Sequence, residues 1–293
     1  MGEGDHEAHG DDMERKADKK LSGWGLFGSQ YDAAADLYYG AATFFKLAKS
    51  WSRAASVYTK IANCHLKLDS KDEAASAYAD AANCYKKFSP HEAARALDQA
   101  VVLFLEVRRL AMAARYCRDA GVIYQQEKDL AMASDYLERA ADLFDDEGQT
   151  CQSNAIKHEI AEIAAKLGRY PKAAEIFEEI ARQSIKSKLL KYSVRAVLLN
   201  AGICQLCIAD GVAMQKSFAR YQEIDPTFWG TREHKLLADL AASMDYGDVA
   251  RFTDAVREFD VVTRVDPWRT ILLLRAKDEL EKQENDDDED DLT

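Results

Sequence analysis

The sequence repeats itself about every twenty residues over much of its length. A small residue, nearly always alanine, recurs in register, with a larger side chain four residues later and a ring eleven residues later. Offsets of 4 and 11 fall on one face of an α-helix, so each period predicts one helix of about sixteen residues and a short turn. The alanines in register are Ala34, Ala54, Ala74, Ala93, Ala113, Ala133 and Ala173.

The predicted turns contain residues that start and stop helices. Asp69 or Ser70 can cap one helix, and Pro90 suits the first position of the next. Gly168 is expected to end a later helix. Short turns make neighbouring helices antiparallel, and stacked hairpins form a twisted solenoid. The sequence therefore predicts an all-α, tetratricopeptide (TPR)-like solenoid of helical hairpins over residues 31–184, although the Trp-Leu-Gly-Tyr signature of consensus repeats is missing.

Charge separates the two ends of the chain from its body. Residues 284–293 contain seven acids and no base, and residues 1–20 contain seven acids and four bases, so the body is nearly neutral. Like charges repel one another and stay solvated. We predict a mobile acidic N-terminal tail over residues 1–30 and an acidic C-terminal tail over residues 284–293. Between Ile185 and residue 283 the helical spacing becomes irregular, which predicts a compact C-terminal helical bundle.

Composition excludes several classes of protein. The net charge of −12 argues against nucleic acid as a partner, because phosphate would be repelled. No apolar run approaches the ~18 residues that a membrane span needs. The polar, acidic N-terminus resembles neither a secretory signal nor a transit peptide, so we expect a cytoplasmic protein.

Catalytic motifs are missing from the sequence. It contains no GxxxxGK[ST], GxGxxG or GxSxG, and we predict no catalytic residue, metal or cofactor. Cys204 and Cys207 form one CxxC inside an apolar helical run, whereas a zinc ribbon needs a second pair. Core packing explains this pair, and a thiol redox enzyme is the alternative. Stacked helices offer an extended surface, which favours a binding protein.

An apolar segment over residues 21–28 precedes the first repeat. Its glycines disfavour helix, and its large apolar residues are Leu21, Trp24, Leu26 and Phe27. One interpretation is that these side chains fold back as a plug on the first hairpin. The other is a weak, reversible membrane contact, since tryptophan is favoured at the headgroup level and lysines lie just before the segment.

Several short stretches follow one another in a distinctive order. They are LFG (Leu26–Gly28), FFKLAKSW (Phe44–Trp51), LLKYS (Leu189–Ser193), TREHKL (Thr231–Leu236), EFDVVTRVDPW (Glu258–Trp268), LLLRAK (Leu272–Lys277) and the closing EDDLT. In this order and spacing the chain resembles the soluble NSF attachment protein family, most closely its α-type members. The resemblance covers nearly the whole chain from about residue 15.

The resemblance implies an adaptor in vesicle-mediated and intracellular protein transport, including transport between the endoplasmic reticulum and the Golgi. Family members bind the four-helix SNARE bundle, made of syntaxin-like and other SNAREs, laterally and in several copies. They recruit and stimulate the hexameric AAA ATPase NSF, which takes the bundle apart, and their apolar N-terminal loop touches the cytosolic face of membranes as a peripheral contact.

The resemblance also assigns residues. Bases that face the SNARE bundle are expected on the inner solenoid face, and acids with a penultimate leucine are expected to engage NSF. The family carries two lysines where this chain has Ala155 and Glu159, with Lys157 and His158 between them. The matching positions are Lys49, Arg109, Arg115, Lys191 and Arg195 for SNARE binding; Glu289, Asp290, Asp291 and Leu292 for NSF, with Asp210, Asp245 and Asp248 as a further acidic surface; and Leu21, Trp24, Leu26 and Phe27 for the membrane.

A second function stays open at this point. A TPR-type co-chaperone or scaffold would bind peptide tails in a concave groove through a compact basic clamp. Such a protein would prefer short peptides, whereas the adaptor would prefer a folded coiled coil.

Overall fold

The structure is a computed structural model that describes residues 2–22 and 29–290, with the residues after Lys282 as backbone only. The chain forms two compact units, Met1–Ile156 and Lys157–Thr293. This division comes earlier than the predicted boundary between Ser184 and Ile185.

Within the described residues every regular element is helical, which confirms the all-α prediction. Unit 1 contains α1 (Glu3–Ser22), α2 (Ser29–Leu47), α3 (Trp51–Lys67), α4 (Lys71–Tyr85), α5 (Pro90–Glu106), α6 (Leu110–Gln126), α7 (Leu130–Asp146) and the start of α8 (Thr150–Lys166). Unit 2 contains the rest of α8, α9 (Tyr170–Ser184), the 3₁₀ turn η1 (Leu190–Ser193), α10 (Val194–Leu206), α11 (Gly211–Ile224), α12 (Arg232–Asp245), α13 (Val249–Val262) and α14 (Pro267–Asp290).

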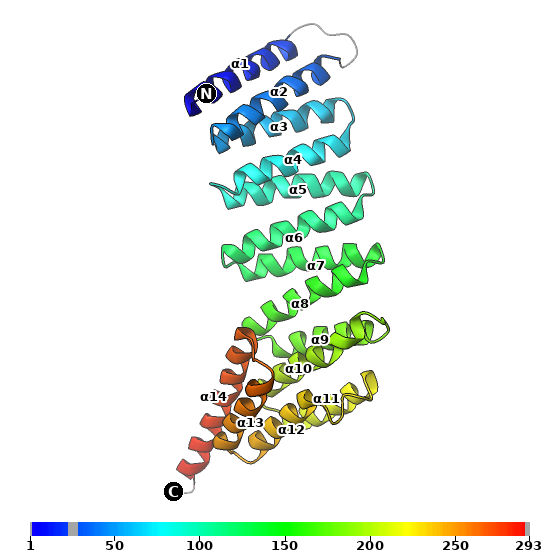
Figure 1. Cartoon of the computed structure of the whole chain (residues 1–293), viewed down its shortest axis with the longest axis vertical. Coiled ribbons are helices and arrows are strands. Elements are labelled where there is room, and N and C mark those ends of the chain that lie inside the picture. The colour runs from blue at the N-terminus through cyan, green and yellow to red at the C-terminus, as the bar shows by residue number, and fades with distance from the viewer. Residues whose placement is uncertain (1, 23–28, 291–293) are drawn as a thin grey trace. The chain divides into compact units, whose positions relative to one another are not determined.

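Small residues let the helices of unit 1 approach one another closely. The six registered alanines from Ala34 to Ala133 are all fully buried, as the repeat predicts. Rings fill the space beside them: Phe104 stacks on Tyr116 of the next helix with 5.5 Å between centroids, and Tyr124 stacks on Tyr136 at 5.3 Å. Successive helices therefore pack as antiparallel hairpins in a TPR-like solenoid (Figure 1).

The tight turns of unit 1 alternate between two edges. The turns α2–α3, α4–α5 and α6–α7 lie at one edge, and α3–α4 and α5–α6 lie at the other (Figure 1). Lys49 and Arg108 hold φ values of 56° and 57° in these turns, a left-handed conformation that closes a helix abruptly. Ser70 stands at the predicted cap of α4, but its side chain makes no capping hydrogen bond. Pro90 opens α5 as predicted.

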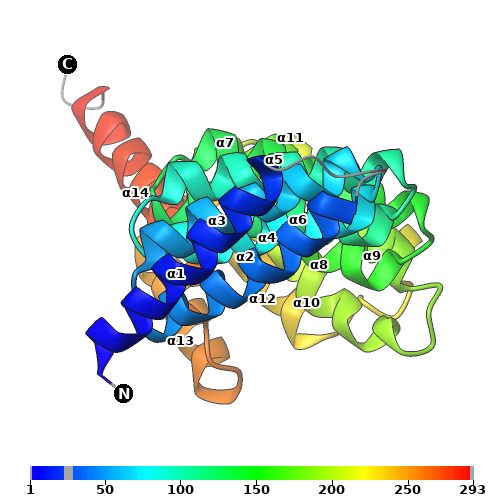
Figure 2. The same cartoon turned by 90° about the horizontal axis from the view of Figure 1, so that it is seen from above.

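The prediction of a mobile N-terminal tail is wrong for Glu3–Ser22, which forms α1 and packs on α2. Its buried residues are Gly10 and Ala17, so the small side chains of α1 face the hairpin. Charge pattern is the physical reason that α1 folds: its acids meet bases on α3, whereas the prediction treated them as self-repelling. Figure 2 shows α1 beside α2 and α3 from the end of unit 1.

Unit 2 encloses its own core, built mainly from α9, α10, α12 and α14. Cys204 is fully buried, and Cys207 is buried with its thiol donating a hydrogen bond to the Leu272 carbonyl at 3.3 Å. Burial raises the pKa of Cys204, and it raises the pKa of Cys207 to about 12. Both thiols are therefore protonated and packed, as core cysteines are, and the redox alternative lacks a reactive thiolate.

A polar network crosses unit 2 between α8, α10 and α14. Arg269 Nε donates to Asn200 Oδ1 at 2.8 Å, which leaves the Asn200 amide nitrogen facing His158 Nε2 at 3.2 Å. His158 Nε2 must therefore accept this hydrogen bond, so the ring is neutral. Burial lowers the pKa of His158, in agreement with this geometry.

Candidate functional site

Two of the predicted SNARE-binding bases lie in turns at opposite edges of unit 1. Lys49 lies in the α2–α3 turn, with its Nζ 3.5 Å from Glu3 Oε1 of α1. Arg109 caps α6 in the α5–α6 turn, with its Nε 3.1 Å from Asp72 Oδ1. Because these turns alternate between edges, the structure separates Lys49 from Arg109 across the width of unit 1 (Figure 1).

Arg115 lies elsewhere in unit 1, on the second turn of α6. Its side chain is exposed, because it follows the buried pair Ala113 and Ala114 and points away from them. It is thus the predicted base of unit 1 that lies on a helix rather than in a turn.

The two predicted bases of unit 2 lie close together around η1. Lys191 is exposed, with its Nζ 5.1 Å from the centroid of the Tyr192 ring. Arg195 lies in the first turn of α10 and donates to Thr227 Oγ1 at 3.2 Å. Leu189 and Tyr192 are each 80% exposed beside these bases. We call these four residues, Leu189, Lys191, Tyr192 and Arg195, the η1 patch.

The apolar half of the η1 patch was missed from the sequence. Leu189 and Tyr192 are not among the predicted binding residues, and apolar side chains in a helical protein are usually buried. The signal was the LLKYS stretch itself, which interrupts the helical spacing. An exposed apolar pair next to two bases suits a partner surface that is acidic and partly apolar.

Lys157 does not substitute for the family lysines replaced at Ala155 and Glu159. Its side chain is only 13% exposed, and its Nζ is 2.6 Å from Glu179 Oε1 on α9. A buried and paired ammonium is not offered to a partner. Lys157 is therefore not added to the predicted binding bases.

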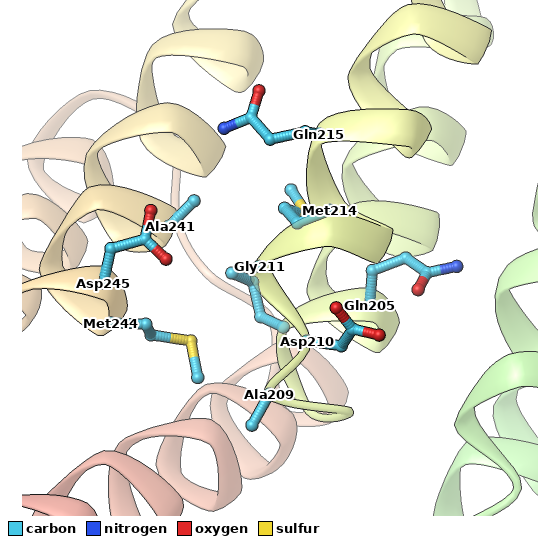
Figure 3. Close-up of a pocket in the computed structure, with 10 residues that line it drawn as sticks. Gln205, Ala209, Asp210, Gly211, Met214, Gln215, Ala241, Met244 and Asp245 are labelled. Atoms are coloured by element: carbon cyan, nitrogen blue, oxygen red, sulfur yellow. The ribbon is translucent and has the colours of Figure 1, made fainter.

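An acidic cleft lies in unit 2 between the α10–α11 turn and the end of α12 (Figure 3). Asp210 caps α11 by accepting from Ala213 N at 3.0 Å, and Asp245 ends α12. Figure 3 shows the two carboxylates on either side of Gly211. A Cβ at Gly211 would lie 2.9 Å from Asp245 Oδ1, so glycine lets this carboxylate approach.

The walls of this cleft combine polar and apolar surface, and its volume is about 50 Å³. Their apolar part comes from Leu206, Met214, Ala241 and Met244, and Gln205 and Gln215 line the cleft beside the two carboxylates. Apolar walls hold the aliphatic stem of a lysine or arginine, and carboxylates bind its charged head. The structure thus brings together two of the three acids that the sequence singled out, Asp210 and Asp245. Asp248 caps α13 in the following turn, where it accepts from Arg251 N at 2.8 Å.

The structure describes only some of the predicted membrane and tail residues. Leu21 lies in the last turn of α1, half-buried against the core of unit 1. Trp24, Leu26 and Phe27 lie outside the described residues, as do Asp291 and Leu292. Glu289 and Asp290 continue the backbone of α14, so the predicted C-terminal tail begins inside a helix.

Among residues 2–22 and 29–290, no helix combines the length and apolar character that crossing a membrane requires. The same residues contain no group of three or more side chains able to hold a metal ion.

Comparison with known proteins agrees with the sequence resemblance. The model of the family "Soluble NSF attachment protein, SNAP" matches residues 8–281. The alpha-soluble NSF attachment protein of Vitis vinifera is 51% identical over 289 residues, 99% of each chain. A probable vesicular-fusion protein sec17 homolog of Schizosaccharomyces pombe is 36% identical, covering 94% of this chain and 98% of its own.

The alpha-soluble NSF attachment protein of Mus musculus is 34% identical over 94% of each chain. A solved structure of kinesin light chain TPR-like repeats from Podosopora anserina covers 71% of this chain and 100% of its own, with 15% identity and a TM-score of 0.42. The family match and the extent of the relatives together show that this chain belongs to the soluble NSF attachment protein family.

Proposed function

We propose that this chain is a non-enzymatic adaptor that binds SNARE complexes and recruits and stimulates the NSF ATPase for SNARE disassembly in vesicle trafficking. The observation that supports it most is the 51% identity to an NSF attachment protein over 99% of both chains. Relatives named for vesicular fusion support the same setting. A TPR-type co-chaperone shares only the helical-hairpin fold, so no specific observation favours it.

The SNARE-binding arm of the adaptor uses scattered bases. Lys49, Arg109 and Arg115 of unit 1 contact the acidic bundle, and Lys191 and Arg195 contact it from the η1 patch of unit 2. An exposed ion pair contributes only ~0–1 kcal/mol, so several must act together. Since Lys49 and Arg109 lie at opposite edges, they touch different parts of the partner, and several copies bind one bundle.

The NSF-binding arm uses acids at the C-terminal end of the chain. Glu289, Asp290, Asp291 and Leu292 engage the ATPase, and the cleft between Asp210 and Asp245 receives a lysine or arginine side chain from it (Figure 3). A buried cationic anchor surrounded by apolar contacts is a common hot spot of protein interfaces. The adaptor itself hydrolyses nothing and transmits force through its stacked helices.

Membrane contact adds avidity to these interactions. Trp24, Leu26 and Phe27, with Leu21 at their start, touch the cytosolic face of the membrane weakly and reversibly. Leu21 is half-buried in α1, so only part of its side chain is available to the membrane. The protein is then cytoplasmic and peripheral on membranes that carry SNAREs.

The Leu292→Ala variant tests the division between the two arms. We expect it to bind a folded SNARE bundle as the native chain does but to stimulate the ATPase less, because Leu292 is the apolar residue of the acidic tail. Binding is measured on an immobilised bundle, and phosphate release is measured with purified NSF. Equal loss of both activities would contradict the division, and preference for short peptides over the bundle would favour the co-chaperone.

A further inference from the structure

Helix α1 carries an acidic stripe on one face. Its members are spaced by three or four residues, which places them along a single side of the helix. We call Glu3, Glu7, Asp11, Glu14 and Asp18 the α1 stripe.

The α1 stripe lies on bases of α3. Arg53 pairs with Asp11, and its Nη2 is 2.9 Å from Glu14 Oε2. Lys60 Nζ lies 2.9 Å from Glu14 Oε1 and 3.0 Å from Asp18 Oδ1. Two bases of α3 thus pair with three acids of α1.

The pairing continues at both ends of α1. Lys49 Nζ is 3.5 Å from Glu3 Oε1 at the start of the helix. At the other end, Tyr38 donates a hydrogen bond to Asp18 at 2.5 Å. Burial would raise the pKa of Asp18, but the hydrogen bonds from Tyr38 and Lys60 outweigh it and lower that pKa. Asp18 therefore stays ionised at neutral pH.

Apolar packing under α1 is limited. Its buried residues are Gly10 and Ala17, and Met13 and Leu21 are partly buried. Gly10 lies against the Phe45 ring, where a Cβ would be 2.6 Å from Phe45 Cε1. A helix held by many ion pairs and few apolar contacts has a low free energy of local opening.

We propose that Lys49, Arg53 and Lys60 form a binding surface for an acidic helix of the SNARE bundle, and that α1 occupies this surface as a competitor from the same chain. The α1 stripe has the chemistry of the proposed partner, a helix with a row of carboxylates. Lys49 belongs both to the predicted SNARE contacts and to the pairs made by α1. The inference rests on the proposed function, since the competing helix is that of the SNARE bundle.

Competition of this kind lowers the apparent affinity for the partner. When only a fraction of molecules has α1 lifted, the apparent affinity falls by that fraction. Weakening the contacts that hold α1 against α3 raises the fraction of molecules in which α1 is lifted. Loss of the three ion pairs that Glu14 and Asp18 make with Arg53 and Lys60 corresponds to about a three- to tenfold gain in affinity for the bundle.

The test compares two double variants that change net charge equally. Glu14→Gln with Asp18→Asn removes the acids that hold Lys60 and part of Arg53. Asp5→Asn with Asp12→Asn is the matched control, because Asp5 bonds to Gly2 N and Asp12 pairs with Lys16, both at the N-terminus of the chain. Binding is measured to an immobilised, soluble four-helix SNARE bundle at one fixed ionic strength.

We expect the stripe variant to bind about three- to tenfold more tightly than the native chain and the control to bind within about twofold of it. Equal gains in both variants would show a general charge effect and overturn the inference. An unchanged or weaker stripe variant would also overturn it. No binding by any of the proteins would overturn the proposed function itself, whereas equal binding by all would overturn this inference alone.

A steric variant tests the same idea without changing charge. Gly10→Leu places a side chain where Phe45 is fully buried, so it unseats α1 while leaving every base and acid in place. We expect faster amide exchange over Glu3–Ser22, native exchange over α4–α7, and the same gain in affinity. Faster exchange in α1 without a gain in affinity would refute competition by α1.

Discussion

Replacement of Arg220 by methionine tests how unit 2 holds a buried charge. Glu178 on α9 is 4% exposed. Arg220 of α11 grips its carboxylate with Nε at 3.0 Å and Nη2 at 2.9 Å, and Arg182 adds one bond at 2.8 Å. Arg220 also donates to Ser217 Oγ at 2.8 Å. The pair therefore joins α11 to α9 and positions the helix that begins at the acidic cleft.

The geometry separates the expected effects of the two arginines. Arg220→Met leaves a buried carboxylate with one remaining partner, which costs about 3 kcal/mol, the lower end for breaking a buried pair. Arg182→Met removes one bond from a side chain that is 47% exposed, which costs at most ~1 kcal/mol. Glu178→Leu combined with Arg220→Met removes both charges, and similar cases are close to neutral, within about 1–2 kcal/mol.

Amide hydrogen exchange measures these differences locally, which matters because two compact units need not unfold together. The free energy of opening is obtained for peptides from α9 and α11, with α4 as an internal reference in unit 1. Arg220→Met should lower it in α9 and α11 by about 2 kcal/mol more than Arg182→Met does. Equal effects of the two, or a double variant as unstable as Arg220→Met, would refute the reasoning.

Two further outcomes follow from unit 2. Asp210→Asn with Asp245→Asn should weaken pull-down of NSF several-fold while leaving SNARE-bundle binding unchanged, because asparagine keeps the cap of α11 but removes the charge of the cleft. Equal weakening of both would argue against a cationic anchor. His158 has a lowered pKa, so an unfolded chain takes up its proton near the ordinary value of 6.5 before the folded chain does. The contribution of His158 to the stability of unit 2 is therefore complete above that pH and is lost as the pH falls toward the folded pKa. Urea titrations at pH 7.5 and 5.5 measure this pH dependence, and His158→Gln should reduce the difference in unfolding free energy between the two pH values. An unchanged difference would contradict the assignment.

The repeat could be predicted from the sequence because the spacing of residues within one helix determines which of them are buried. Ala54 and Ala113, like the other registered alanines, are buried where the 3.6-residue period places them. Helix starts such as Pro90 were equally local, and so was the packing of Cys204 in an apolar run. Family membership needed only the order of short stretches along the chain.

Helix α1 shows where sequence reasoning fell short. Seven acids in the first twenty residues predicted self-repulsion, because the prediction counted the charges without considering which face of a helix each one occupies. On a helix, five of them form one stripe, and Arg53 and Lys60 receive it. The partner of each acid lies about forty residues away along the chain, beyond the reach of any local pattern.

Sequence by itself determined the helices, their buried faces, the neutral body with acidic ends, and the family of this protein. Tertiary structure alone decided which charges meet. Lys49 and Arg109 were separated because tight turns alternate between two edges, and Asp210 and Asp245 were brought together because two turns 35 positions apart close on Gly211. The physical reason is that a helix period reports which side of a segment is buried, whereas electrostatic pairing depends on distances that exist only after the segments have packed.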